Sequence, residues 1–189
     1  MPTTLRPRWI ADRVRAALGD TPVVAIVGPR QAGKSTLLQH LVRTSHEGWT
    51  SWTLDDVNVL ERARNDPAGL VASATGPLAL DEVQRAPDLL LAIKASVDRD
   101  RRPGRFLLTG SADVMAMPRY GDALTGRAET VVLRPFSQGE LAGVREDFVT
   151  WAFAEAPPPA IDAAPADLPD RVVTGGFPPA AERASHERR

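Results

Sequence analysis

Cysteine is absent from the 189-residue sequence, so neither a disulfide nor a thiolate metal site can form. Histidine is scarce as well, and His40, His46 and His186 are too scattered for us to expect a metal site built on them. The formal net charge of −1 provides no overall basic field of the kind that attracts nucleic acid. These absences argue against a thiolate or histidine metalloprotein and against a generally basic nucleic-acid-binding protein.

Long apolar runs are missing too. No run approaches the length of a membrane span, and the amino-terminal segment MPTTLRPRWIADRV lacks the apolar core of a signal peptide. Apolar residues make up 43% of the sequence and charged residues 25%, as in an average soluble domain. The length suits one α/β domain with a proper core. We therefore expect a cytoplasmic protein without a membrane partner.

Short apolar segments alternate with segments of helical spacing. Apolar segments without internal charge predict strands buried on both faces, at PVVAIV (22–27), PLALDE (77–82), RFLLTGS (105–111) and TVVLRP (130–135). A further strand that ends in acidic residues is predicted at WTSWTLDD (49–56). Apolar residues at helical spacing predict helices near 9–18, 37–42, 55–65 and 89–97. This alternation predicts an α/β fold in which a parallel β-sheet is sandwiched by helices.

The pattern changes after Leu133. Ser137 and Glu140 have the spacing of a capping box, which predicts the start of a short helix. The segment EAPPPAIDAAPADLPD, residues 155–170, is rich in proline and alanine and predicts a linker or an extended loop.

A glycine-framed loop follows the first predicted strand. It satisfies the pattern G-x-x-x-x-G-K-S/T, in which backbone N–H groups and a helix N-terminus meet phosphate charge. Lys34 is then expected to reach the β- and γ-phosphates, and the Ser35 hydroxyl to bind Mg²⁺. The alternative is a glycine-rich turn with a solvated lysine. The predicted nucleotide-binding residues are Gly28, Pro29, Arg30, Gln31, Ala32, Gly33, Lys34, Ser35 and Thr36.

Acidic and hydroxyl side chains come at the ends of the next two buried strands. Asp81 stands 47 residues after Lys34, where a P-loop NTPase holds its Mg²⁺, and Glu82 could polarise the attacking water as a general base. Thr109 and Ser111 are candidates for contact with the γ-phosphate or the water. A solvated strand end and simple capping hydroxyls are the alternatives.

Arginines near the last predicted strand are candidates for stabilising transition-state charge. Arg127 and Arg134 flank that strand and could act within the chain or across an interface, and the alternative is a surface arginine in a salt bridge. The basic turn DRDRRPGR, residues 98–105, could meet nucleic acid or a partner subunit, although its interspersed aspartates favour a solvated loop.

Together, these motifs resemble those of a large group of prokaryotic predicted ATPases of the AAA+ superfamily. In that group an AAA-type domain is commonly followed by a C-terminal domain of unknown function. The resemblance runs from about residue 9 to residue 178 and rests on GPRQAGKSTLL, LDD, LDEVQRAPDLLLAIKASVDRD, RFLLTGSA, ALTGRAETVVLRPFSQGEL and GGFP.

The resemblance implies an ASCE-type domain that binds and hydrolyses ATP with Mg²⁺. It assigns phosphate and metal binding to residues 33–35, the acidic motif to Asp81 and Glu82, and the sensor strand end to residues 109–111. The arginine of the group's "GR" pair falls on Arg127, so a homo-oligomer is a candidate arrangement.

The sequence departs from the group after the predicted sheet. The proline–alanine segment replaces a helical continuation, and few residues follow Pro178. We therefore predict a P-loop domain at 1–150 and a linker with a truncated continuation at 151–189, with an incomplete lid over the nucleotide. The leading hypothesis is a Mg²⁺-dependent ATPase. A nucleotide-dependent interaction module with an unidentified protein partner and a small-molecule kinase are the alternatives, and the Asp–Glu pair disfavours the kinase.

Overall fold

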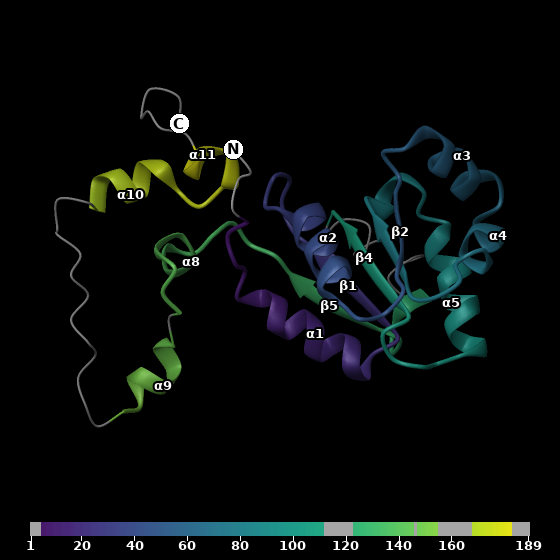
Figure 1. Cartoon of the computed structure of the whole chain (residues 1–189), viewed down its shortest axis with the longest axis horizontal. Helices are drawn as coiled ribbons and strands as arrows, with labels where there is room; N and C mark the ends of the chain where they lie inside the picture. Colours follow the sequence, from purple (N-terminus) through teal and green to yellow (C-terminus); the bar gives the residue numbers. More distant parts are fainter. Residues whose placement is uncertain (1–4, 112–122, 146, 155–167, 183–189) are drawn as a thin grey trace. The chain divides into compact units, whose positions relative to one another are not determined.

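The structure of the protein is a computed structural model that describes residues 5–111, 123–145, 147–154 and 168–182. The chain divides into two compact units, one formed by residues 10–134 and the other by residues 1–9 together with 135–189. Figure 1 shows the elements of both units along the chain. The predicted domain boundary at residue 150 stays a prediction.

A parallel β-sheet forms the centre of the unit 10–134. Among the described residues it has five strands in the order β2 (Thr50–Thr53), β3 (Leu78–Asp81), β4 (Phe106–Gly110), β1 (Val23–Val27) and β5 (Ala128–Val132). All of these neighbours pair in parallel, and Val23 lies level with Phe106 on one side and with Ala128 on the other. The predicted parallel sheet is therefore confirmed.

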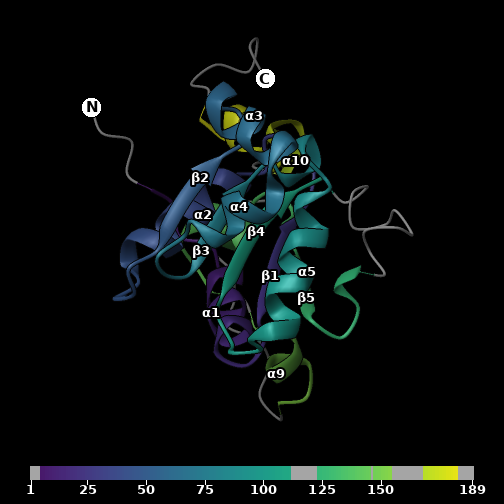
Figure 2. The same cartoon turned by 90° about the vertical axis from the view of Figure 1, so that its right-hand side faces the viewer.

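Helices cover both faces of this sheet. One face carries α1 (Ile10–Asp20) and α2 (Lys34–Thr44), and the other carries α3 (Val57–Asn65), α4 (Pro67–Ala72) and α5 (Leu89–Arg99). Successive strand residues point to opposite faces. Accordingly, Val24 and Ile26 pack with Leu38 of α2, whereas Val23 packs with Ile93 of α5. Figures 1 and 2 show the resulting layers of helix, sheet and helix.

The sheet edges differ from the sequence-based expectation. The last strand was predicted to be buried on both faces, and this is wrong, because β5 is an edge strand and Val132 keeps 51% of its surface exposed. At the other edge, residues of β2 alternate between half-buried and exposed. The central strands β1, β3 and β4 are buried throughout, as predicted.

The second unit contains short helices. They are α8 (Gln138–Ala142), α9 (Phe148–Ala152), α10 (Leu168–Thr174) and α11 (Pro178–Ala181). The predicted capping box is confirmed, since Ser137 Oγ accepts from the N–H of Glu140 and the Glu140 carboxylate accepts from the N–H of Ser137. The buried Glu140 carboxylate also accepts from Arg8 Nε at 3.1 Å and from the N–H of Trp9 at 2.9 Å. The amino-terminal segment is thereby held against α8.

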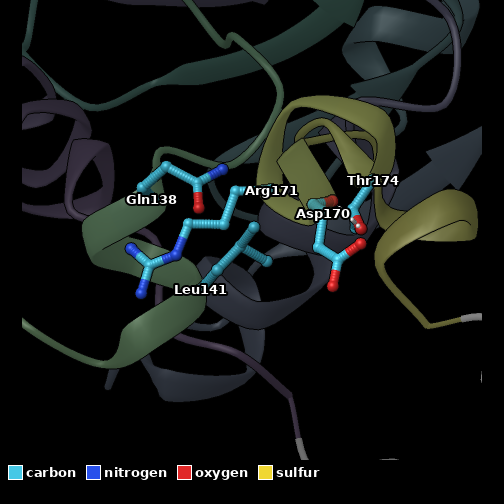
Figure 3. A pocket seen from close by; sticks show the side chains of 5 residues that line it. All are labelled: Gln138, Leu141, Asp170, Arg171 and Thr174. Carbon is cyan, nitrogen blue, oxygen red and sulfur yellow. Dashed lines mark hydrogen bonds between the residues drawn. The ribbon is translucent and has the colours of Figure 1, made fainter. Parts of the chain in front are cut away.

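A pocket of about 240 Å³ lies between α8 and α10 in this unit. Figure 3 shows its lining, in which the Arg171 side chain extends from α10 across to α8. None of the residues predicted to bind nucleotide lines it. Most of the predicted proline–alanine linker lies outside the described residues, as does His186. In the part of the chain that the structure describes, no helix combines the length and the apolar character that crossing a membrane requires.

Candidate nucleotide site

The glycine-framed loop connects β1 to α2 at the carboxyl edge of the sheet. Its two framing glycines adopt positive φ angles, 155° at Gly28 and 95° at Gly33. A Cβ added to Gly28 would lie 2.1 Å from the carbonyl oxygen of Leu133, so only glycine fits beside β5 at this point. Gln31 is also left-handed, with φ 63°, which costs roughly 1–2 kcal/mol for a residue with a Cβ. The chain thus retains a strained loop at a strand end where ligands of open α/β sheets bind.

Lys34 is the first residue of α2, and its side chain folds back over the loop. Its Nζ donates to the carbonyl oxygens of Gly28 at 3.1 Å and Pro29 at 3.0 Å, and only 7% of the residue is exposed. Gly33 precedes α2 and offers no side-chain cap to its first N–H groups. A cation and uncapped helical N–H groups therefore converge at this loop, as an anion site requires.

The strand order brings an acidic residue and two hydroxyls together beside the loop. Because β4 lies between β1 and β3, the end of β4 reaches both neighbouring strand ends. Ser35 Oγ donates to Asp81 Oδ1 at 3.0 Å, and the fully buried Thr109 hydroxyl donates to the same oxygen. Asp81 is itself 8% exposed. The structure thus joins three of the predicted residues in one hydrogen-bonded cluster.

Glu82 follows Asp81 in a left-handed conformation, with φ 62°. Its N–H donates to Thr109 Oγ1 at 3.1 Å, so the Thr109 hydroxyl contacts both members of the acidic pair. The Glu82 carboxylate accepts from the side-chain amide of Gln84, which the sequence analysis did not single out. The amide oxygen of Gln84 in turn accepts from the N–H of Ser111 at 3.3 Å. The only sequence signal for Gln84 is its place two residues after Glu82, in the segment DEVQ.

The structure does not bring Arg127 to this cluster. Arg127 immediately precedes β5, and its carbonyl oxygen accepts from the N–H of Val23, so it lies at the amino edge of the sheet. Five residues of strand, about 17 Å at 3.3 Å per residue, separate that edge from the loop. Its Nε donates instead to Asp98 Oδ1 at 2.6 Å. A role within the chain's own site has no support in this geometry, and a role across an interface stays a prediction.

Arg134 lies at the other end of β5. The preceding residue, Leu133, donates its N–H to the carbonyl oxygen of Val27 at 2.7 Å, directly before the loop. Arg134 is therefore at the same edge of the sheet as Gly28, although the resemblance had assigned the catalytic arginine to Arg127.

The basic turn 98–105, whose first two residues are the last two of α5, makes internal contacts. Arg105 donates to the carbonyl oxygens of Ser96 and Asp100 and so holds the end of α5. Hydrogen bonds from Arg102 lower the pKa of the Asp100 carboxyl, and hydrogen bonds from Arg127 and then Lys94 lower the pKa of Asp98. These pairings match the solvated-loop interpretation of residues 98–105.

The donor set beside the loop fits Mg²⁺ held jointly with phosphates. No group of three or more histidine, aspartate or glutamate side chains within the described ranges could hold a metal ion by itself. Ser35 and Asp81 nevertheless supply a hydroxyl and a carboxylate, the hard oxygen ligands that Mg²⁺ prefers. Because Mg²⁺ commonly binds through one or two carboxylates together with substrate phosphates, this small set suits that ion.

Fold and site together define a P-loop NTPase with an additional strand between the loop strand and the acidic strand. Residues 20–142 match a family model described as "AAA domain", and the chain belongs to this family. The expected relationship to AAA-type ATPases is thereby confirmed.

Two curated relatives are uncharacterized proteins of mycobacteria. Rv2008c of Mycobacterium tuberculosis (strain ATCC 25618 / H37Rv) and Mb2031c of Mycobacterium bovis (strain ATCC BAA-935 / AF2122/97) are each 35% identical to this chain over 152 residues. These matches cover 80% of the chain and 33% of each relative. The matched region therefore spans about a third of the length of these relatives.

Solved structures share the fold at low sequence identity. The replication initiator DnaA bound to AMPPCP and single-stranded DNA aligns with a TM-score of 0.56 and 14% identity, over 96% of this chain and 60% of that one. The Walker-type ATPase PABY2304 of Pyrococcus abyssi aligns with a TM-score of 0.54 and 16% identity, over 92% and 65% respectively. These likenesses confirm the α/β P-loop fold.

Proposed function

We propose that the chain binds ATP with Mg²⁺ at the loop 28–36 and hydrolyses it to ADP and phosphate. The observation that carries this proposal is the hydrogen-bonded cluster of Ser35, Asp81, Thr109 and Glu82 beside that loop. Membership of the AAA domain family and the AMPPCP bound by DnaA, a structural neighbour, support ATP as the nucleotide.

In this proposal the loop and Lys34 bind the phosphates. The backbone of residues 28–36 would wrap the phosphates, and the N–H groups at the start of α2 would meet their negative charge. Lys34 Nζ now bonds to two loop carbonyl oxygens, and exchanging these for phosphate oxygens would give it charged acceptors instead. Ser35 and Asp81 would hold Mg²⁺, which neutralises developing charge on the phosphates when it is bound.

In this proposal Glu82 and Thr109 serve the hydrolysis step. In the proposed reaction a water oxygen attacks the γ-phosphorus, a water proton passes to the Glu82 carboxylate, and the bond to the β–γ bridging oxygen breaks. The Thr109 hydroxyl fixes the backbone from which Glu82 projects. The products are ADP and inorganic phosphate.

The position of Arg127 favours a second candidate function. Because this arginine lies at the amino edge of the sheet, it could serve only a neighbouring molecule's site. If hydrolysis requires the arginine of a neighbouring molecule, a single chain would bind nucleotide without hydrolysing it and would serve as a nucleotide-dependent interaction module. ATP would then be hydrolysed only in a homo-oligomer. The structural neighbour DnaA is also bound to single-stranded DNA, but the internal pairing of the basic turn gives no comparable support here.

Nucleotide binding and turnover can be tested separately. Binding of Mg·AMPPCP by calorimetry should weaken about tenfold or more in Lys34→Ala, roughly 1.4 kcal/mol, and stay near wild type in the surface control Lys94→Ala. Phosphate release from ATP should fall about 100-fold or more in Glu82→Gln with binding retained, and should be unchanged in Glu61→Gln, an exposed control on α3.

Several results would redirect the proposal. Wild-type binding without turnover at any protein concentration would favour the interaction module, whereas turnover that rises with concentration would indicate a completed neighbouring site. Phosphate transfer to an added small-molecule acceptor, with little release to water, would indicate a kinase. Failure of the wild type to bind Mg·AMPPCP would eliminate all of these functions.

A further inference from the structure

Gln84 makes side-chain contacts on both sides of the site. Its side-chain NH₂ group donates to Glu82 Oε2, and its amide oxygen accepts from the N–H of Ser111 at 3.3 Å. Glu82 follows the end of β3, and Ser111 follows the end of β4. One side chain therefore links the carboxylate after the acidic strand to the backbone after the neighbouring strand.

The orientation of the Gln84 amide follows from its two partners. A carboxylate offers only acceptors and a backbone N–H is only a donor. The NH₂ group must therefore face Glu82 and the oxygen must face Ser111, since the flipped amide would lose both hydrogen bonds. The contact is thus polar and directional at both ends.

Local structure fixes where the Gln84 side chain starts. Gln84 is the middle residue of the 3₁₀ helix η1 (Val83–Arg85), and Val83 is buried with 1% of its surface exposed. Glu82 enters η1 in the left-handed conformation, with its N–H bound to Thr109. The backbone from which both side chains start is therefore held in place, and the Gln84 amide holds one oxygen of the Glu82 carboxylate.

The other carboxylate oxygen of Glu82 accepts no hydrogen bond from the described residues. A free glutamate side chain loses on the order of 1.5–2 kcal/mol of rotamer entropy when it is fixed. An amide that fixes one oxygen carries this cost in the resting protein and leaves the second oxygen available to accept from a water. A general base held in this way does not have to be ordered during the reaction.

We propose that Gln84 is a positioning residue that holds Glu82 ready to accept a proton from the attacking water. This inference rests on the proposed hydrolysis of ATP. In this role Gln84 acts through Glu82 and not on the nucleotide or the water directly. The amide donor to Glu82 matters for turnover, and the acceptor facing Ser111 keeps that donor correctly turned.

Two substitutions separate the two ends of the amide. Gln84→Leu removes donor and acceptor at similar size, whereas Gln84→Glu keeps an acceptor for the Ser111 N–H and replaces the donor by a carboxylate. Gln39→Leu is the matched control, because Gln39 lies exposed on α2 and its side chain makes no hydrogen bond to the described residues.

Turnover should fall while binding stays. We expect kcat for ATP to drop about tenfold to 100-fold in both Gln84 variants, as for other residues that orient a reacting group, with the Kd for Mg·AMPPCP within about twofold of wild type. The control should keep both constants. An unchanged or raised kcat in Gln84→Leu would overturn the proposal, and so would wild-type turnover in Gln84→Glu or a parallel loss of nucleotide affinity and stability.

A second measurement does not depend on turnover. In ¹H–¹⁵N spectra of the nucleotide-free chain, the side-chain NH₂ resonances of Gln84 should move in Glu82→Gln and stay in place in Glu61→Gln. Resonances that do not respond to Glu82→Gln would overturn the contact itself. A wild-type chain that binds nucleotide without turnover would remove the proposed hydrolysis and this role together, whereas wild-type hydrolysis with a fully active Gln84→Leu would refute the positioning role alone.

Discussion

The hydroxyl of Thr109 is the group of the site whose contribution to stability can be tested most directly. Thr109 is completely buried, and its Oγ1 donates to Asp81 Oδ1 and accepts from the N–H of Glu82 at 3.1 Å. Thr109→Val replaces this hydroxyl by a methyl group of nearly the same size. The change leaves the part-buried N–H of Glu82 without the Thr109 acceptor and removes one of the two hydroxyl donors to Asp81.

The expected loss of stability can be worked from these contacts. An unsatisfied buried N–H costs about 1–3 kcal/mol, and a hydrogen bond to a charged group contributes about 1.5–3 kcal/mol. Burying the extra methyl group returns about 1 kcal/mol. Thr109→Val should therefore lower the free energy of unfolding by about 1.5–5 kcal/mol. At roughly 2–4 °C per kcal/mol for a chain of this length, Tm should fall by about 3–20 °C.

Urea unfolding of the nucleotide-free chain, followed by circular dichroism, measures this difference without the contribution of bound ligand. Thr109→Ser is the matched control, because it keeps the hydroxyl and loses only a methyl group, at a cost of about 1 kcal/mol. If Thr109→Val unfolded at the same urea concentration as wild type, the hydroxyl could not be joining Asp81 to Glu82. A larger loss in Thr109→Ser than in Thr109→Val would refute the reasoning in the same way.

Two further changes test the loop and the amino edge of the sheet. Gly28→Ala places a Cβ 2.1 Å from the Leu133 carbonyl oxygen at a positive φ, so the free energy of unfolding measured in urea should fall by about 2–4 kcal/mol. The control Gly19→Ala in α1 has open space around the new Cβ and should raise that free energy by about 0.5–1 kcal/mol. Equal effects of the two substitutions would contradict the close approach at Gly28. Asp98 has its pKa lowered by Arg127, so its carboxylate stabilises the fold above the unfolded pKa near 4, and this contribution disappears as the pH falls through the lower folded pKa. The difference in unfolding free energy between wild type and Asp98→Asn should accordingly shrink between neutral pH and about pH 3, and a pH-independent difference would show that the ion pair is not formed.

The loop and the acidic strand were predictable because each depends on local sequence. A charge-free segment before Gly28 and an apolar stripe after Lys34 identify a strand and a helix with the loop between them. In a parallel sheet the carboxyl ends of all strands meet at one edge, so Asp81 and Thr109 were expected to lie near that loop. The structure places both there, with Ser35 bonded to Asp81.

Features set by tertiary context were harder to predict. The burial of a strand depends on its neighbours, and TVVLRP contains nothing that identifies β5 as an edge strand. The placement of Arg127 was available in principle, because a residue that precedes a parallel strand lies at the edge opposite the loop. The prediction for Arg127 rested on its place beside the strand and on the "GR" pair of the resembling group, and neither says at which edge of the sheet the side chain lies. The contacts of Gln84 depend on the tight turn of η1, which the segment DEVQ does not specify by composition.

The left-handed conformation of Glu82 explains why the cluster behaves as one unit. A glutamate at φ 62° costs roughly 1–2 kcal/mol relative to an ordinary conformation, and such a cost persists only where the surroundings hold the residue in place. Here the backbone N–H is held by Thr109 and the carboxylate by Gln84. Thr109 is in turn bonded to Asp81, to which Ser35 donates from the start of α2. A change at Asp81 or Thr109 therefore alters both the residues proposed to bind nucleotide and the residue proposed to activate water, so separating binding from turnover requires substitutions at the outer end of the chain of contacts, at Glu82 or Gln84.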